Sequence, residues 1–303
     1  MGTYNTIITE IEDGIMTLTI NRPDKMNSFT REMMSEMMAA FDESDADDSV
    51  KAVIVTGAGD RAFCAGADLS GGGKTFDYAA HGEARDPNSP IREDGSVDFN
   101  HPATRDGGGQ LVLRIFNSKK PVIGAINGAS VGVGTTMQLP MDVRLASTKA
   151  RFGFVFAKRG IAPDGACSWF LPKIVGISKA LEWCFSGKVF GAEEAKDAGL
   201  VRSIHEPEDL MPAARALAKE MTAESAPVSV SLTRQMLWLM LGADHPMEAH
   251  KFDSQVIWSR GGSADAKEGV TSFLEKRAPD YPCKVSERPH FSPWMDERPY
   301  GEK

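Results

Sequence analysis

Two glycine-bearing turns constrain this chain most, because each follows an apolar run typical of a buried β-strand. Residues 64–68 come after the run at 52–56, and residues 128–134 come after the run at 121–126. In an α/β sheet both turns would lie at the edge that normally carries the binding site. Small residues there let a carbonyl oxygen approach bare backbone N–H groups. Together the turns predict a site for a developing oxyanion, whereas either one alone is typical of an ordinary tight turn.

Strand and helix alternate through the first half of the chain. Residues 6–12 and 16–21 flank the dipeptide Asp13-Gly14, which predicts a β-hairpin. Apolar residues at helical spacing follow Thr30, a favourable N-cap residue, so a capped amphipathic helix is expected before the next strand. This β-α-β order predicts an α/β fold with right-handed crossovers. Further elements are expected at 110–118 (helix), 121–126 (strand), 135–139 (short helix) and 142–146 (strand).

Residues 70–109 interrupt this alternation. They are rich in Gly, Asp, Pro and Asn, they lack clear periodicity, and they are long for a loop inside a compact domain. The sequence leaves two interpretations of this insert open, a mobile lid and a disordered segment.

The C-terminal third is predicted to be mainly helical, with 201–204 as its one strand. So many apolar helix faces are most simply buried by subunit contact as well as by packing on the core. We therefore divide the chain into a core at 1–203, a helical oligomerisation region at 204–278 and an extended arm at 279–303. The arm is expected to dock through its aromatic residues or to be partly disordered. The helices are expected at 167–174, 178–186, 192–198, 209–224, 227–241, 246–260 and 264–276.

Composition narrows the class of protein. The 303 residues, 42% hydrophobic and 25% charged, can bury a sizeable core. The formal net charge of −8 argues against nucleic acid or an anionic membrane as a partner. No apolar stretch is long enough to span a membrane and the N-terminus lacks a signal-peptide pattern, so a cytoplasmic location is expected. Four cysteines without CxxC spacing and six scattered histidines predict no metal site.

Four motifs then occur in one order along the chain. They are NRPDKMNS at 21–28, TG at 56–57 leading to FCAGADL at 63–69, PVIGAING at 121–128, and SFLEKR at 272–277. Together they resemble the crotonase superfamily, also called the enoyl-CoA hydratase/isomerase family, over most of residues 4–277. The resemblance implies a crotonase-like ββα-superhelix (spiral) core with a helical C-terminal trimerisation region, in a homo-trimer or a dimer of trimers. It also implies an acyl-CoA thioester substrate, with coenzyme A entering as part of that substrate and no permanently bound cofactor.

The resemblance places the oxyanion hole on the backbone N–H groups of Ala67 and Val133. Two fixed donors in a dry pocket would each stabilise a thioester enolate by roughly 3 kcal/mol. It further implies that Phe273 and Lys276 close the site of a neighbouring subunit; without it, Lys25 and Lys276 would be read as solvated lysines and Phe273 as a core aromatic residue. The expected substrate- and CoA-binding residues are Lys25, Ala65, Gly66, Asp68, Leu69, Val131, Gly132, Thr136, Phe156, Phe273 and Lys276.

The chain departs from the family pattern at its acids. Hydratases of this family carry two glutamates that hold and split a water, and their positions fall on Thr136 and Phe156. Neither residue can act as a carboxylate base, so standard hydration is not expected. Asp164 instead resembles the second acid of dienoyl-CoA isomerases, and an apolar wall formed by residues such as Phe154, Phe156 and Trp169 is expected to raise its pKa. The alternative for Asp164 is an N-cap of the following helix.

The predicted function is an acyl-CoA enzyme that stabilises a thioester enolate and transfers a proton or double bond, with Asp164 as the proton-transfer group. One alternative is hydrolysis or carbon–carbon cleavage of a bulky acyl-CoA, which a wide pocket beneath residues 70–109 would favour. A second alternative is a non-catalytic acyl-CoA-binding subunit, which an Asp164 carboxylate bound to helix amides would favour.

Overall fold

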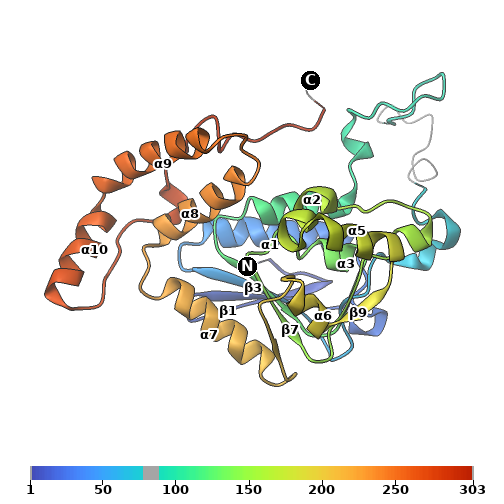
Figure 1. Cartoon of the computed structure of the whole chain (residues 1–303), viewed down its shortest axis with the longest axis horizontal. Helices are drawn as coiled ribbons and strands as arrows, with labels where there is room; N and C mark the ends of the chain where they lie inside the picture. Colours follow the sequence, from blue (N-terminus) through green and yellow to red (C-terminus); the bar gives the residue numbers. More distant parts are fainter. Residues whose placement is uncertain (1, 78–88, 302–303) are drawn as a thin grey trace.

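Two β-sheets organise residues 2–77 and 89–301, the part of the chain that the computed structural model describes (Figure 1). The larger sheet has the order β1-β2-β3-β5-β7-β10, and the smaller has the order β4-β6-β8-β9. The larger sheet consists of β1 (Ile7–Glu12), β2 (Ile15–Ile20), β3 (Ala52–Gly57), β5 (Val122–Ile126), β7 (Val143–Ser147) and β10 (Ser203–His205). The smaller sheet consists of β4 (Ala62–Cys64), β6 (Ala129–Val131), β8 (Arg151–Gly153) and β9 (Val189–Gly191).

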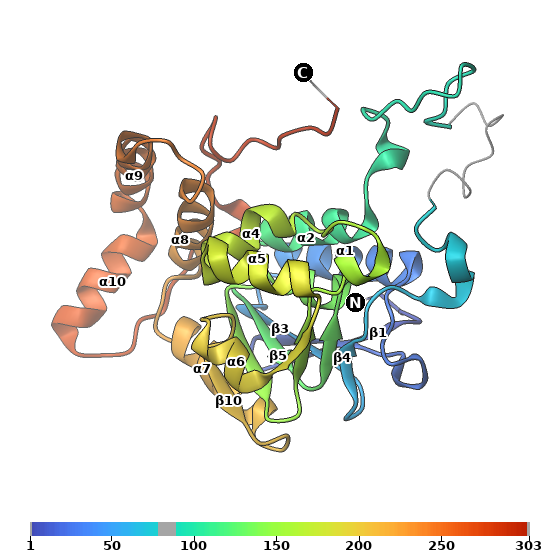
Figure 2. The same ribbon diagram turned by 45° about the vertical axis from the view of Figure 1, so that its right-hand side comes forward.

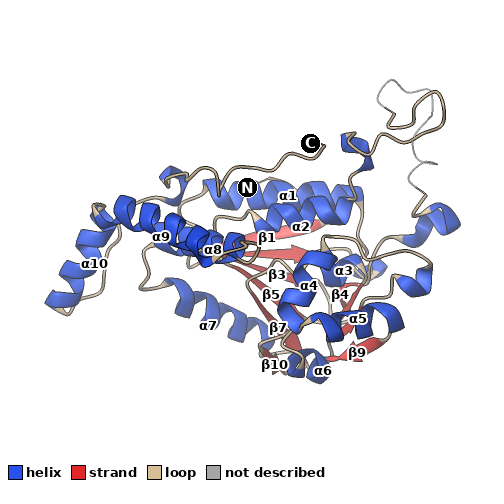
Figure 3. Cartoon of the chain, turned by 45° about the horizontal axis from the view of Figure 1, so that its top comes forward, coloured by secondary structure: helices blue, strands red, loops and turns tan. Residues whose placement is uncertain are grey.

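Helices cover both faces of the larger sheet (Figure 3). Helices α1 and α2 lie on one face and α7 lies on the other, whereas α8, α9 and α10 extend away from the sheets. The helices are α1 (Arg31–Ala46), α2 (Gly107–Phe116), α3 (Val133–Thr136), α4 (Cys167–Val175), α5 (Ile177–Ser186), α6 (Ala192–Asp197), α7 (Leu210–Thr222), α8 (Pro227–Met240), α9 (Pro246–Gly261) and α10 (Ala264–Glu275). The short 3-10 helices are η1 (Pro23–Lys25), η2 (Leu69–Lys74), η4 (Pro102–Thr104), η5 (Ala157–Arg159) and η6 (Val285–Glu287).

Strand β3 shows why the central strands are apolar at every position. Val53 and Val55 belong to the core that α1 and α2 cover, whereas Ile54 belongs to a second core with α7. Successive side chains of a strand point to opposite faces, so a strand covered on both faces becomes a continuous apolar run. β3 also pairs in parallel with β2 and β5, which places it in the middle of the sheet.

Most predicted elements are confirmed. β1 and β2 form the expected antiparallel hairpin, and the Thr30 side chain accepts a hydrogen bond from the Met33 amide at the start of α1. The helix expected at 110–118 begins three residues earlier, because Asp106 caps it. Its first three residues are glycines. The prediction of a single strand after residue 166 is wrong, since β9 precedes β10. The strands of the smaller sheet have three residues each, too few to show a period.

The insert expected at 70–109 is partly structured. η2 overlaps its start, η4 lies within it, and α2 begins before it ends. Residues 78–88 lie outside the described part of the chain, so both interpretations of this stretch remain predictions. None of the described helices has both the length and the apolar character needed to cross a membrane.

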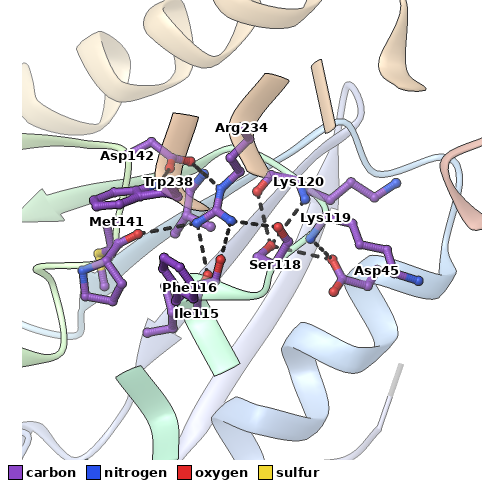
Figure 4. Close-up of polar contacts among 12 residues, drawn as sticks. Asp45, Ile115, Phe116, Ser118, Lys119, Lys120, Met141, Asp142, Arg234 and Trp238 are labelled. Carbon is purple, nitrogen blue, oxygen red and sulfur yellow. Dashed lines mark hydrogen bonds and ion pairs between the residues drawn. The ribbon is translucent and has the colours of Figure 1, made fainter. Parts of the chain in front are cut away.

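A buried arginine attaches α8 to the sheet (Figure 4). Arg234 pairs with Asp142 at 2.8 Å and donates to the carbonyls of Ile115, Phe116, Ser118 and Pro140. Trp238, one turn further along α8, donates a 2.7 Å hydrogen bond to the same Asp142 carboxylate. A cation among the last carbonyls of α2 also suits the negative end of that helix.

The C-terminal arm packs along the outside of the molecule (Figures 1 and 2). Its Trp294 ring stacks on Phe252 of α9 with ring centroids 5.0 Å apart, and Phe291 contacts the same ring. Further along, the Tyr300 hydroxyl lies 3.0 Å from the Thr104 hydroxyl. The end of the arm therefore rests on the segment that leads into α2.

Candidate functional site

The two glycine turns predicted from the sequence pack directly against each other. The first turn follows β4 and the second contains β6, and these two strands pair in parallel in the smaller sheet. A Cβ on Gly134 would stand 2.0 Å from the Cys64 carbonyl oxygen, and a Cβ on Gly66 would stand 3.0 Å from the Val131 carbonyl oxygen. Real Cβ atoms essentially never show the first distance and seldom the second, and Gly66 also has φ 106°, so glycine is what allows these two turns to meet.

The backbone around Ala67 leaves its amide facing away from the neighbouring segment. Phe29 donates to the Gly66 carbonyl at 2.8 Å, and Asp68 donates to the Phe29 carbonyl at 3.0 Å. N–H groups alternate in direction along an extended segment, so the Ala67 N–H points to the side opposite Phe29. Among the described residues, no backbone carbonyl accepts a hydrogen bond from it.

Val133 is the first residue of α3. Gly132 precedes it with φ 56°, a left-handed conformation that favours glycine, and the first amides of a helix have no partner inside it. Within residues 2–77 and 89–301, no backbone carbonyl accepts a hydrogen bond from the Val133 N–H. The Val133 side chain is buried in the core. Both amides named by the family resemblance are therefore on adjoining turns and unpaired by backbone.

Asp164 lies in the loop before α4, and its carboxylate is held by a side chain rather than by helix amides. The Thr136 hydroxyl donates a 2.9 Å hydrogen bond to its Oδ1. The N-cap of α4 is Ala166, with no side-chain cap, so the N-cap alternative for Asp164 does not hold. Burial is the largest influence on the Asp164 carboxyl and raises its pKa to about 6, against the Thr136 hydrogen bond. A carboxylate with such a pKa can exchange protons near neutral pH.

The residues expected to form an apolar wall near this carboxyl, Phe154, Phe156 and Trp169, lie in or against the main hydrophobic core. Phe154 stacks on Trp183 with ring centroids 5.9 Å apart, and Trp169 packs edge-on against Phe116, so both belong to aromatic clusters of the core. Gly165, the residue after Asp164, faces α2 and α3. A Cβ on Gly165 would stand 2.8 Å from the Thr136 hydroxyl and 3.3 Å from Val112.

Several predicted CoA-binding residues surround the first turn. The Asp68 carboxylate accepts from the Ser70 amide and pairs with Arg22 at 3.0 Å, which lowers its pKa to about 2. Its side chain therefore shapes the turn. Lys25 and Leu69 are exposed beside it. Of the others, Gly66, Gly132, Thr136 and Phe156 are buried, and Ala65 and Val131 are half-buried.

Phe273 and Lys276 lie far from the two turns within one chain. Both are exposed on or just after α10, which projects at the opposite end of the molecule from α3 (Figures 1 and 2). They could reach an Asp164 site only from another copy of the chain, and that role remains a proposal.

Sequence reasoning missed Asp106. Its side chain accepts a hydrogen bond from the Gly109 amide and caps α2. A Cβ on Gly108 would stand 3.3 Å from its Oδ1 and 3.5 Å from the Asp164 Cγ, so the two carboxyl groups share one corner of the site. The signal was an aspartate before a helix, which the three following glycines concealed.

Comparison with known proteins identifies the family. The family model described as enoyl-CoA hydratase/isomerase matches residues 10–88 and 98–284. The chain belongs to the enoyl-CoA hydratase/isomerase family. It is 36% identical to enoyl-CoA hydratase ACTT3 of Alternaria alternata over 91% of this chain and 86% of that protein. It is 32% identical to 1,2-epoxyphenylacetyl-CoA isomerase of Escherichia coli K12, over 92% of this chain and 98% of that protein.

Solved structures agree with the family. An enoyl-CoA hydratase from Bacillus anthracis superposes with a TM-score of 0.78 at 25% identity, covering 91% of this chain and 99% of the other. The predicted crotonase fold is thereby confirmed. As a member of this family, the chain is an acyl-CoA enzyme, with coenzyme A as part of its substrate. Among the described residues, no group of three or more His, Cys, Asp or Glu side chains is arranged to hold a metal ion.

Proposed function

We propose that this enzyme moves a proton, and with it a double bond, on an enoyl-CoA. The amides of Ala67 and Val133 hold the thioester oxygen, and Asp164 carries the proton. The observation that supports this assignment most is the position of the Asp164 carboxyl. The point 3.5 Å from its Cγ, where a Gly108 Cβ would stand, is also 3.0 Å from the Val133 side chain. The base and one oxyanion donor therefore belong to the same small region.

The proposed reaction needs no group beyond these. The Asp164 carboxylate takes a proton from a carbon of the acyl chain, and the electron pair of that C–H bond moves through the conjugated chain onto the thioester oxygen. The two amides stabilise the resulting enolate, because their positions are fixed before charge develops. When the enolate collapses, its electron pair forms a new C–H bond with the proton that Asp164 returns to a different carbon.

The residues that this chain has at the two glutamate positions of hydratases favour proton transfer over standard hydration. Thr136 and Phe156 occupy them, and neither side chain can deprotonate water. Thr136 is instead used to hold Asp164. The relatives include proteins named as hydratases and one named as an isomerase, so the family alone supports both reactions.

The contacts of Asp164 do not support the alternative of a non-catalytic acyl-CoA-binding subunit. That alternative requires the Asp164 carboxylate to be bound by amides of α4, whereas the described helix has no side-chain cap. Hydrolysis or carbon–carbon cleavage depends on the shape of a pocket beneath residues 70–109, of which 78–88 are outside the described residues. Incubation with CoA esters distinguishes hydrolysis and cleavage from proton transfer by their products.

The decisive experiment is incubation with enoyl-, dienoyl- and 3-oxoacyl-CoA esters in deuterated water, followed by mass spectrometry and NMR of the products. We expect deuterium on carbon and a shifted double bond without net addition of water. The D164N variant should lose this exchange by more than a hundredfold while still binding the CoA ester. The matched control is D60N, which removes an exposed aspartate and should behave as wild type.

Three results would contradict the proposal. Rapid formation of a 3-hydroxyacyl-CoA would make the enzyme a hydratase, and release of free coenzyme A or a shortened acyl-CoA would favour the hydrolase or cleavage alternative. Unchanged exchange in D164N would remove Asp164 from the mechanism.

We further propose that the enzyme assembles as a homo-trimer or a dimer of trimers, with α9 and α10 in the contacts. These helices expose large apolar side chains, namely Ile257, Trp258, Val270, Phe273 and Leu274, of which Trp258 is 89% exposed. Several large apolar side chains left exposed on neighbouring helices are typical of subunit interfaces. Native mass spectrometry should show a trimer or hexamer for wild type and a smaller species for W258E.

A further inference from the structure

We propose that Asp106 is a positioning residue of this active site, whose negative charge, held next to Asp164 across Gly108, makes Asp164 a stronger base. The inference deepens the proposed function and rests on Asp164 being the proton-transfer group. Asp106 comes from a different element, the N-terminus of α2, and neither the resemblance nor the glycine turns pointed to it.

Gly108 brings the two carboxyl groups together. A Cβ on this residue would stand 3.0 Å from the Val133 Cγ2, 3.3 Å from the Asp106 Oδ1 and 3.5 Å from the Asp164 Cγ. All three atoms therefore surround a single point on the first turn of α2. Any side chain at position 108 would have to push into one of them, so the glycine maintains the short separation.

The glycines at the start of α2 are not required by the backbone. None of Gly107, Gly108 and Gly109 has a positive φ, and glycine is an unfavourable residue within a helix. Their value lies in the space that they leave: a Cβ on Gly109 would stand 2.5 Å from the Asp106 carboxylate. The first turn thus keeps Asp106 folded back over the helix end and close to Asp164.

Asp106 lies at the N-terminus of α2. Its carboxylate accepts a hydrogen bond from the Gly109 amide at the N-terminus of α2, where an anion is favourable. Arg105 precedes it, but the Arg105 guanidinium lies over the Tyr300 ring, 5.3 Å from the ring centroid. The C-terminal arm, which carries Tyr300, thereby holds the Arg105 guanidinium against the Tyr300 ring.

Among the residues that the structure describes, the other side chains found to interact with Asp164 carry no charge. Thr136 on α3 is a neutral donor. Cys167 on α4 also senses the Asp164 charge, but the Cys184 thiol on α5 and burial raise the pKa of Cys167, which keeps its thiol protonated. Among the described residues, Asp106 is the one side-chain charge that acts on Asp164, and it acts after burial to raise the pKa of that carboxyl. A base of higher pKa takes a carbon-bound proton faster.

The test uses D106N, because asparagine caps a helix as well as aspartate does and removes only the charge. The ionisation of Asp164 is followed directly by 13C NMR of protein labelled at the aspartate carboxyl carbons, with its signal assigned by its loss in D164N. We expect the Asp164 midpoint to fall by about one pH unit in D106N, and the acid limb of kcat/KM to move down equally. The plateau rate should fall about threefold, as for a base weakened by one unit.

The control is D209N, which removes the charge at the N-cap of α7, where the aspartate makes no side-chain cap. It should leave both the Asp164 titration and the rate unchanged. An unshifted Asp164 titration in D106N would overturn the proposal and leave Asp106 as a helix cap. A loss of turnover above a thousandfold would also overturn it, since Asp106 would then be a proton-transfer group itself. Because the NMR titration needs no turnover, failure of the proposed reaction and failure of this inference give different results.

Discussion

The hydroxyl of Thr136 donates a 2.9 Å hydrogen bond to the carboxylate of Asp164. Thr136 occupies a position where hydratases of this family carry a glutamate. In this chain the residue at that position is not a base itself but holds the carboxylate of Asp164. The bond favours the charged form of Asp164 and lowers its pKa, whereas burial and the Asp106 charge raise it. The ionisation of Asp164 is set by this balance, and the first predictions follow from it.

Replacing Thr136 with valine removes the hydrogen bond while nearly keeping the shape. The Asp164 pKa should then rise above its value of about 6, so the acid limb of kcat/KM should move to higher pH. We expect a shift of about one unit. The matched control is T135V, which also loses a buried hydroxyl, one that donates to the Ser130 carbonyl and not to Asp164. Equal shifts in the two variants would show that the hydrogen bond has no specific effect.

The same carboxyl should make stability depend on pH. In the unfolded chain the pKa of Asp164 is the ordinary value of 3.8, whereas burial raises its pKa to about 6 in the folded chain. The folded state therefore binds more protons between these values, and this group lowers the free energy of unfolding as pH rises through the window. D164N removes the penalty, so relative to wild type it should gain up to about 3 kcal/mol between pH 4 and pH 8. Urea unfolding at both pH values measures this, and a constant difference would contradict it.

The contact between the two turns should tolerate no side chain at Gly134. A Cβ there would stand 2.0 Å from the Cys64 carbonyl oxygen, so G134A must move one turn away from the other. We expect a stability loss of about 3 kcal/mol or more, together with loss of activity. The control is G73A, since nothing lies within 4 Å of a Cβ at position 73. Thermal melts and turnover of the two variants should differ sharply, and a fully active G134A would show that the turns can separate without consequence.

Arg234 should carry much of the attachment of α8 to the sheet. R234M would leave the Asp142 carboxylate and four carbonyls without their buried cation (Figure 4). Breaking a buried pair from one side costs about 3–5 kcal/mol. R277M is the control, because Arg277 makes its ion pairs at the surface of α10. Urea midpoints should fall clearly for R234M and hardly for R277M, and equal midpoints would contradict the role assigned to Arg234.

The sequence predicted best those helices and strands whose own residues carry a clear pattern. β3 and β5 are continuous apolar runs because helices cover both faces of the larger sheet. The start of α1 could be predicted because its cap, Thr30, acts through a local hydrogen bond. The smaller sheet could not be predicted, because three-residue strands such as β4 carry no period and are held by pairing with distant residues.

The site was predicted where motifs are local and missed where segments converge. The turns at Gly66 and Gly134 stand out in the sequence, but the contact of Thr136 with Asp164 joins residues 28 positions apart. Asp106 lies further away still, before a helix whose start is concealed by glycines. Nothing in the local pattern of Asp106 indicates that it meets Asp164, since Gly108 brings them together only after α2 and α4 have packed.

The proposed function requires the amides of Ala67 and Val133 to hold one thioester oxygen. A crystal structure of the enzyme with a non-reactive acyl-CoA analogue tests it most directly. The account predicts that the thioester oxygen lies about 3 Å from both amide nitrogens, with the Asp164 carboxylate beside the acyl chain. An oxygen bound by neither amide, or a thioester seated away from these two turns, would contradict it.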